Sequence, residues 1–141
     1  MDQLEKTIQD IHKRGDGGRL KMVYTIPDFQ NPSGITMSLE RRKALVELAE
    51  KYNFLILEDT PYRQLRYTGE SVAPIYALDS YGRTISLFTF SKIFCPGFRL
   101  GWVVAPKPII EKLVIAKQAT DLCTAPFTQA ITYEFLKRGY L

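Results

Sequence analysis

Amphipathic segments and short apolar runs alternate along the first half of the chain. In residues 2–14, hydrophobic residues recur at helical spacing, at Leu4, Ile8 and Ile11. Ser38 can cap a second helix, because its side chain can accept a hydrogen bond from a backbone N–H of the first turn. This pattern predicts a helix that ends at Asn53 and buries one apolar face, formed by Leu45, Leu48, Ala49 and Tyr52.

Two short apolar runs flank the second predicted helix. Residues 22–26 are partly β-branched and predict a strand, and the loop that follows contains Pro32 and Gly34. Residues 54–57, Phe-Leu-Ile-Leu, are apolar at every position, which is typical of a strand buried on both faces. A strand, a helix and a strand joined by short connections predict a parallel βαβ unit.

The second half of the chain adds two strands and two helices. The runs at 84–90 and 100–105 predict strands, and the second of them places Trp102 in the core. Only about nine residues separate them, too few for a helical crossover, so we expect them to be antiparallel or in different layers. Helices are expected from Pro126 and from Pro108, the latter burying Ile109, Leu113 and Ala116. Together these elements predict an α/β fold with a partial, mostly parallel sheet flanked by helices.

Composition narrows the functional classes. The 141 residues suit one domain, and 45% apolar with 24% charged residues is typical of a soluble globular protein. The net charge of +4 comes from scattered residues, which gives little support for nucleic-acid binding.

No apolar run in the sequence is long enough for a membrane helix, and no secretory signal is visible. Cys95 and Cys123 lack metal-ligand spacing, so we expect no metal and a reducing, cytoplasmic setting.

Polar residues follow each of the first three predicted strands. Asn31 follows the first strand, Asp59 and Tyr62 follow the second, and Lys92 follows the third. Arg99 lies seven residues beyond that lysine. Each has an ordinary explanation alone: turn formation, helix capping, packing, or a solvated surface charge. In open α/β sheets, however, ligands bind beyond the carboxyl ends of the strands, so we expect these side chains to converge on one site.

Pyridoxal 5′-phosphate (PLP) is a cofactor whose chemistry needs this set of groups. Its aldehyde needs an amine, which Lys92 can supply as a Schiff base. Its pyridine nitrogen stays protonated beside a carboxylate such as Asp59, which raises the pKa of that nitrogen. Tyr62 and Asn31 can donate hydrogen bonds to the phenolate oxygen of the ring. The phosphate needs a guanidinium and hydroxyl groups, which are available from Arg99, Thr89 and Ser91.

Four motifs in this order resemble the large domain of fold-type-I PLP enzymes. They are Asn31-Pro32-Ser33-Gly34, Glu58-Asp59-Thr60-Pro61-Tyr62, Thr89-Phe90-Ser91-Lys92 and Pro96-Gly97-Phe98-Arg99-Leu100-Gly101-Trp102. More narrowly, the chain is similar to class I/II aminotransferases of the aminoadipate/kynurenine type, from about residue 20 to 138. The resemblance implies an aspartate aminotransferase-like large domain. It also implies that Lys92 forms the internal aldimine, that Asp59 pairs with the ring nitrogen, and that the other residues named above hold the ring and phosphate.

The resemblance further implies the reaction and the assembly. Lys92 would move a proton on the substrate, an amino group would pass between an amino acid and a 2-oxo acid, and the protein would be a homodimer. A Gly-rich phosphate loop, a ring-stacking aromatic residue and a C-terminal small domain are expected in such enzymes. None is visible here, so residues 1–141 are expected to form a single partial domain with weak or no activity alone. The alternatives are a fold-type-I C–S lyase or decarboxylase and the aminotransferase-like effector domain of a transcription regulator.

Overall fold

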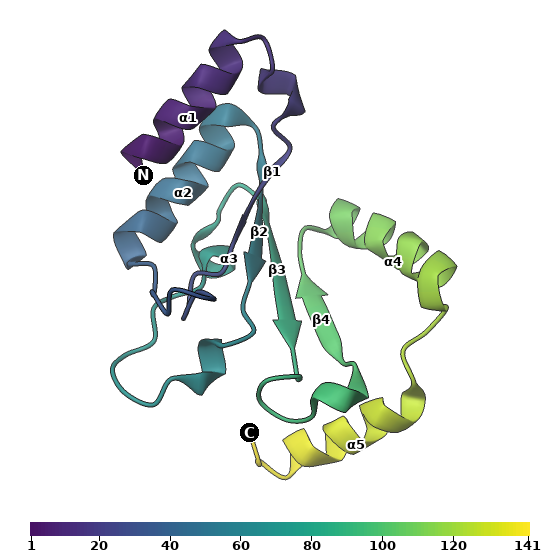
Figure 1. The fold of residues 1–141 in the computed structure, drawn as a ribbon. Helices are drawn as coiled ribbons and strands as arrows, with labels where there is room; N and C mark the ends of the chain where they lie inside the picture. Colours follow the sequence, from purple (N-terminus) through teal and green to yellow (C-terminus); the bar gives the residue numbers. More distant parts are fainter.

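The computed structural model describes all of residues 1–141 and has one sheet with helices packed on part of it (Figure 1). The strands are β1 (Met22–Thr25), β2 (Leu55–Asp59), β3 (Thr84–Thr89) and β4 (Gly101–Val104). The helices are α1 (Asp2–Lys13), α2 (Leu39–Tyr52), α3 (Ile75–Leu78), α4 (Lys107–Asp121) and α5 (Pro126–Lys137). Three single 3₁₀ turns occur at Gly17–Arg19, Arg63–Leu65 and Pro96–Phe98.

The sheet has the order β1-β2-β3-β4 and is mostly parallel. β1 pairs with β2 and β2 with β3 in parallel, so the predicted βαβ unit is confirmed. β4 pairs antiparallel with β3, because the short segment between them allows a reversal of direction but no crossover. Gly101 makes this pairing close: a Cβ there would lie 2.6 Å from the Phe88 carbonyl oxygen. The α/β fold class expected from the sequence is therefore correct.

One face of the sheet carries the hydrophobic core. The core joins α1, α2, β2 and α3 through Ile8, Leu45, Val46, Leu48, Ala49, Phe54, Ile56 and Ile75. Side chains alternate along β2, so Ile56 and Glu58 are buried while Leu55 and Leu57 on the other face are half-buried. The prediction that residues 54–57 are buried on both faces is therefore wrong for this chain. An apolar run shows that a strand can be covered on both sides, but here α1, α2 and α3 cover only one of them.

The capping signals of α2 are confirmed. The Ser38 side chain accepts a hydrogen bond from the Arg41 backbone N–H at 3.4 Å, and Asn53 ends the helix in the left-handed conformation at φ 54°. The short helix α3 was not predicted from the sequence. It is held by the buried Glu58 carboxylate, which accepts hydrogen bonds from the backbone N–H groups of Ile75 and Tyr76 at 2.7 and 3.1 Å. A four-residue helix depends on such tertiary contacts, because it is too short to be stable by itself.

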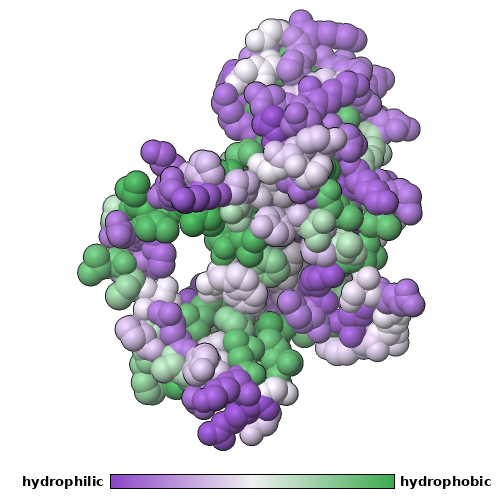
Figure 2. Space-filling view, turned by 180° about the vertical axis from the view of Figure 1, so that it is seen from behind, coloured by the Kyte–Doolittle hydropathy of each residue, from purple (hydrophilic) through white to green (hydrophobic).

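The region after β3 is more open than the sequence pattern predicted. Residues 111–120 of α4 are exposed throughout, so the expected burial of Leu113 and Ala116 is wrong, and Ile109 is half-buried. Trp102 was expected in the core but is 39% exposed, with its ring stacked on Phe88 at 4.9 Å. Figure 2 shows the result as hydrophobic side chains on the surface of the part of the chain that includes α4 and α5. No helix is long and apolar enough to cross a membrane.

Candidate functional site

The carboxyl ends of β1, β2 and β3 lie at one edge of the sheet and bring the predicted polar residues toward it. Asp59 is the last residue of β2, and Thr89 is the last residue of β3. Asn31 lies in the loop after β1, and Lys92 follows β3 by three residues. Parallel strands in register share an edge, so the predicted convergence follows from the topology.

Asp59 is already held by a neighbour on the adjacent strand. The hydroxyl of Tyr24 in β1 donates a hydrogen bond to Asp59 Oδ2 at 2.7 Å. In the parallel register Tyr24 lies opposite Leu57, two residues before Asp59 on the same face of β2. The hydrogen bond to Asp59 raises the pKa of Tyr24 to about 12, with smaller contributions from burial and from the nearby Tyr62. This face is the one that α1 and α2 leave open.

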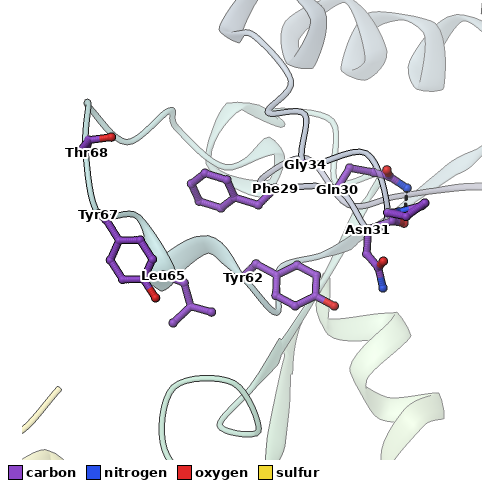
Figure 3. A pocket seen from close by; sticks show the side chains of 9 residues that line it. Phe29, Gln30, Asn31, Gly34, Tyr62, Leu65, Tyr67 and Thr68 are labelled. Atoms are coloured by element: carbon purple, nitrogen blue, oxygen red, sulfur yellow. Dashed lines mark hydrogen bonds between the residues drawn. The ribbon is translucent and has the colours of Figure 1, made fainter.

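Asn31 and Tyr62 line one cavity of about 560 Å³ (Figure 3). The Tyr62 hydroxyl and the Asn31 carboxamide point toward one another in this view, and neither side chain has a hydrogen-bond partner in the chain. The remainder of the wall is formed by Phe29, Gln30, Pro32, Gly34, Leu65, Tyr67 and Thr68. Two hydrogen-bond donors therefore converge on one space between the loop after β1 and the segment after β2.

A buried charge cluster fixes the two segments that form this cavity. Asp28, only 1% exposed, accepts two hydrogen bonds from Arg42 of α2, at 2.8 and 3.2 Å. Arg63, in the segment that carries Tyr62, donates to the same carboxylate at 3.1 Å, and Arg66 lies 3.7 Å from it. Asp28 thus joins the loop after β1, helix α2 and the segment after β2. The guanidinium of Arg66 also lies over the Phe29 ring in the cavity wall, 4.6 Å from its centroid.

The predicted site residues at and after the end of β3 are Thr89, Ser91, Lys92 and Arg99. Lys92 is exposed and makes no hydrogen bond or ion pair with any side chain. Thr89 Oγ1 accepts a hydrogen bond from the Ser91 backbone N–H at 3.0 Å and donates to the Leu100 carbonyl oxygen at 3.3 Å. Arg99 adopts the left-handed conformation at φ 53°, and its side chain donates to the Pro96 carbonyl oxygen at 3.3 Å. No contact joins Lys92 or Arg99 to Asn31, Asp59 or Tyr62 in this structure.

Two functional features were missed from the sequence. Tyr24 lies on the same face of the sheet as Asp59, which the period-two alternation of the strands could have indicated once the register was known. No sequence pattern indicated the Asp28–Arg42 ion pair. Arg42 stands next to other charged residues on α2, and such a run has the pattern of a solvated helix face. Only the contacts between distant segments show that it is buried.

The Tyr24–Asp59 hydrogen bond predicts a stability difference that depends on pH. Because the folded state raises the pKa of Tyr24 from 10.0 to about 12, the contribution is complete below pH 10 and is lost as the pH rises through 12. Tyr24 is 55% exposed, so we expect Tyr24→Phe to lower the free energy of unfolding by about 0.5–1 kcal/mol at neutral pH. Urea unfolding of both chains from neutral to strongly alkaline pH should show this difference disappearing. A difference that persists when Tyr24 is ionised would contradict the assignment.

Comparison with known proteins agrees with this geometry. Residues 1–138 match the family model described as aminotransferase class I and II. The chain belongs to this aminotransferase family. It is 54% identical over all 141 residues to an aromatic-amino-acid aminotransferase of Thermococcus litoralis and covers 33% of that protein. The crystal structure of Pyrococcus horikoshii kynurenine aminotransferase, in complex with PMP, superimposes with a TM-score of 0.94 at 49% identity, covering 99% of this chain and 34% of that one.

A transcription regulator is also among the relatives of this aminotransferase-family chain. An uncharacterised HTH-type transcriptional regulator of Bacillus subtilis is 40% identical over 124 residues, which is 88% of this chain and 25% of the regulator. In every case the chain spans about a third of the relative, or less. The fold-type-I aminotransferase resemblance of the four sequence motifs is confirmed at the level of family and fold.

Proposed function

We propose that this chain carries the cofactor-binding centre of a PLP-dependent aminotransferase, which transfers an amino group between an amino acid and a 2-oxo acid. The observation that carries the proposal is the arrangement of Asn31, Asp59, Tyr62 and Lys92 at one edge of a family-typical sheet. The PMP in the Pyrococcus horikoshii enzyme, a relative with nearly the same backbone, supports the choice of cofactor.

The chemistry of the donor set fits PLP. Asn31 and Tyr62 offer an amide and a phenol without partners in the chain, and Lys92 offers an unpaired amine. Asp59 uses Oδ2 for Tyr24 and leaves Oδ1 without a donor. A pyridine nitrogen, a ring oxygen and an aldehyde would satisfy these groups together.

Each residue then has a defined role in the proposed reaction. When bound, PLP would supply an aldehyde that condenses with an amine and a protonated ring that accepts electrons. Lys92 would provide that amine, and its free Nζ could carry a proton to and from the substrate Cα. Asp59 would hold the proton on the ring nitrogen, and Asn31 and Tyr62 would donate hydrogen bonds to the ring oxygen. The phosphate would be bound by Thr89, Ser91 and Arg99.

Binding of the phosphate would require small changes in the hydrogen bonds that Thr89 and Arg99 make. Arg99 uses one N–H for the Pro96 carbonyl oxygen, which leaves the other guanidinium donors for an anion. The Thr89 hydroxyl donates to the Leu100 carbonyl oxygen at 3.3 Å, a long hydrogen bond that a phosphate oxygen can replace. The backbone N–H of Ser91 points at the Thr89 hydroxyl, so the turn holds these groups together.

The second candidate function is a PLP-binding effector domain of a transcription regulator, and the Bacillus subtilis relative favours it. It would use the same Lys92 and Asp59 but would not need turnover. A C–S lyase or decarboxylase would also use these two residues. Incubation of the chain with PLP, an amino acid and a 2-oxo acid separates the enzymes among these candidates. Amino-group transfer supports the aminotransferase, and release of sulfide or carbon dioxide supports the lyase or the decarboxylase.

Reductive labelling tests the proposed site itself. The chain is incubated with PLP, reduced with borohydride, digested and mapped by mass spectrometry. We expect the phosphopyridoxyl mass on the peptide that contains Lys92, because this amine follows the same edge of the sheet as the other proposed cofactor contacts. A label distributed over the lysines of α1, α2 and α4 would overturn the proposal.

We also expect this chain to self-associate, as the proposed homodimer would require. Large apolar side chains are exposed on β4, α4 and α5, among them Trp102, Val103, Val114, Ile115, Phe127 and Tyr133. Removing such surface from water stabilises an assembly by about 25 cal/mol for each Å² of apolar area. Sedimentation velocity at increasing protein concentration should show a shift to larger species. A single monomeric species at every concentration would contradict the expectation.

A further inference from the structure

Asp59 has one hydrogen-bond donor in this chain, and that donor is Tyr24. The Tyr24 hydroxyl lies 2.7 Å from Asp59 Oδ2, whereas Oδ1 has no hydrogen bond or ion pair. Asp59 is half-buried at the end of β2, where the ladder with β3 stops at Leu87. A carboxylate at this position can rotate about its own side-chain bonds unless a fixed group holds it.

Tyr24 is well placed to be that fixed group. It belongs to β1, whose backbone pairs with β2 from Met22 to Thr25, so its Cα position is set by the sheet. A tyrosine side chain has two rotatable bonds and a rigid ring, which reaches across from β1 to the end of the neighbouring strand. Tyr24 also keeps its proton near neutral pH. Asp59 raises the pKa of Tyr24 to about 12, so the phenol remains a hydrogen-bond donor through the neutral range.

We propose that Tyr24 is a positioning residue, which fixes Asp59 Oδ2 so that Oδ1 is presented to the pyridine nitrogen of the cofactor. This inference rests on the proposed function and adds to it a residue outside the four motifs. Tyr24 acts through Asp59 and needs no contact with the cofactor. A neutral phenol takes little charge from the carboxylate, so its main effect is on the direction of Oδ1.

The affinity for PLP should therefore depend on Tyr24, and only when Asp59 is present. Loss of a hydrogen bond to a charged group at this half-exposed site should raise the dissociation constant of PLP about five- to tenfold in Tyr24→Phe. In an Asp59→Ala background, which removes the acceptor, the same substitution should change the dissociation constant by less than about twofold. Tyr76→Phe is the matched control, because it removes an exposed phenol whose hydroxyl has no hydrogen bond.

The experiment is an absorbance titration of PLP into the four chains of this double-mutant cycle and the control, each also labelled with borohydride. The pH at which the visible band of bound cofactor changes is the second readout, since loss of general stability would not move it. We expect that pH to shift in Tyr24→Phe and to stay constant in Tyr76→Phe. Equal effects of Tyr24→Phe with and without Asp59, or equal dissociation constants for Tyr24→Phe and Tyr76→Phe, would overturn the role of Tyr24.

The labelling arm separates this inference from the function on which it rests. If the unchanged chain is not labelled at Lys92, the proposed function fails, and the inference fails with it. If Lys92 is labelled and the cycle shows no coupling between Tyr24 and Asp59, the proposed function stands and only the positioning role is wrong.

Discussion

A Lys92→Ala chain is expected to lose all site-specific labelling by PLP and borohydride. Lys92 is the lysine that follows the carboxyl end of a strand, at the edge where Asp59, Asn31 and Tyr62 also lie. The remaining lysines lie on α1, α2, α4 and α5, or, in the case of Lys21, at the opposite end of β1. At these amines PLP would react without the additional contacts proposed for Asn31, Asp59 and Tyr62. Peptide mapping of the mutant should therefore show only the low, dispersed labelling of surface lysines.

Lys107→Ala is the matched control for this prediction. It removes the same charge from an exposed lysine of α4, whose side chain is 87% exposed. We expect this variant to be labelled at Lys92 as strongly as the unchanged chain. Equal labelling of the Lys92→Ala and Lys107→Ala chains would show that PLP reacts with surface lysines alone.

Asp28→Ala should cause the largest loss of stability of any single substitution considered for this chain. Asp28 is the only carboxylate that pairs with Arg42 and Arg63, and its removal leaves the fully buried Arg42 guanidinium without a counter-charge. Loss of one partner of a buried pair costs about 3–5 kcal/mol. This is a large part of the free energy of unfolding of a small domain, which is about 5–15 kcal/mol. Urea unfolding followed by circular dichroism measures the change.

Two further variants make the Asp28 prediction specific. Asp16→Ala removes a surface carboxylate that pairs with Arg19 at 3.5 Å, and should change the free energy of unfolding by less than about 1 kcal/mol. Arg63→Ala leaves Asp28 paired with Arg42 and should cost about 1–3 kcal/mol, while loosening the segment that carries Tyr62. If Asp28→Ala unfolds at the same urea concentration as Asp16→Ala, the cluster does not stabilise the fold.

The polar residues of the candidate site could be proposed from the sequence because their placement depends on topology more than on packing. Once a βαβ unit is inferred, residues that follow successive strands must lie at one edge, whatever the details of the core. Asn31, Asp59, Tyr62 and Lys92 could therefore be named from the sequence. Their mutual distances could not, because they depend on loop conformation. The structure brings Asn31 and Tyr62 to one cavity and leaves Lys92 and Arg99 without contact to them.

The failed predictions share one physical cause. Helix periodicity identifies an apolar face on α4, and an apolar run identifies β4, but neither pattern specifies what covers that surface. Trp102 and Leu113 are accordingly exposed in this chain although their local pattern is that of a core. The reverse holds for Arg42, which is fully buried although its neighbours on α2 are charged. Its partner Asp28 lies outside the helix, and no local pattern contains that information.

The sequence by itself therefore determined the family, the order of the four strands and of the four longer helices, and the chemical groups of the candidate site, since all of these follow from local pattern and spacing. Tertiary structure alone decided which groups touch. It placed Tyr24 on Asp59 through the register of two strands, and it buried Asp28 among arginines from two separate segments. Hydrogen bonds and ion pairs act over a few ångströms, and only the folded chain brings residues that are distant in sequence within that range.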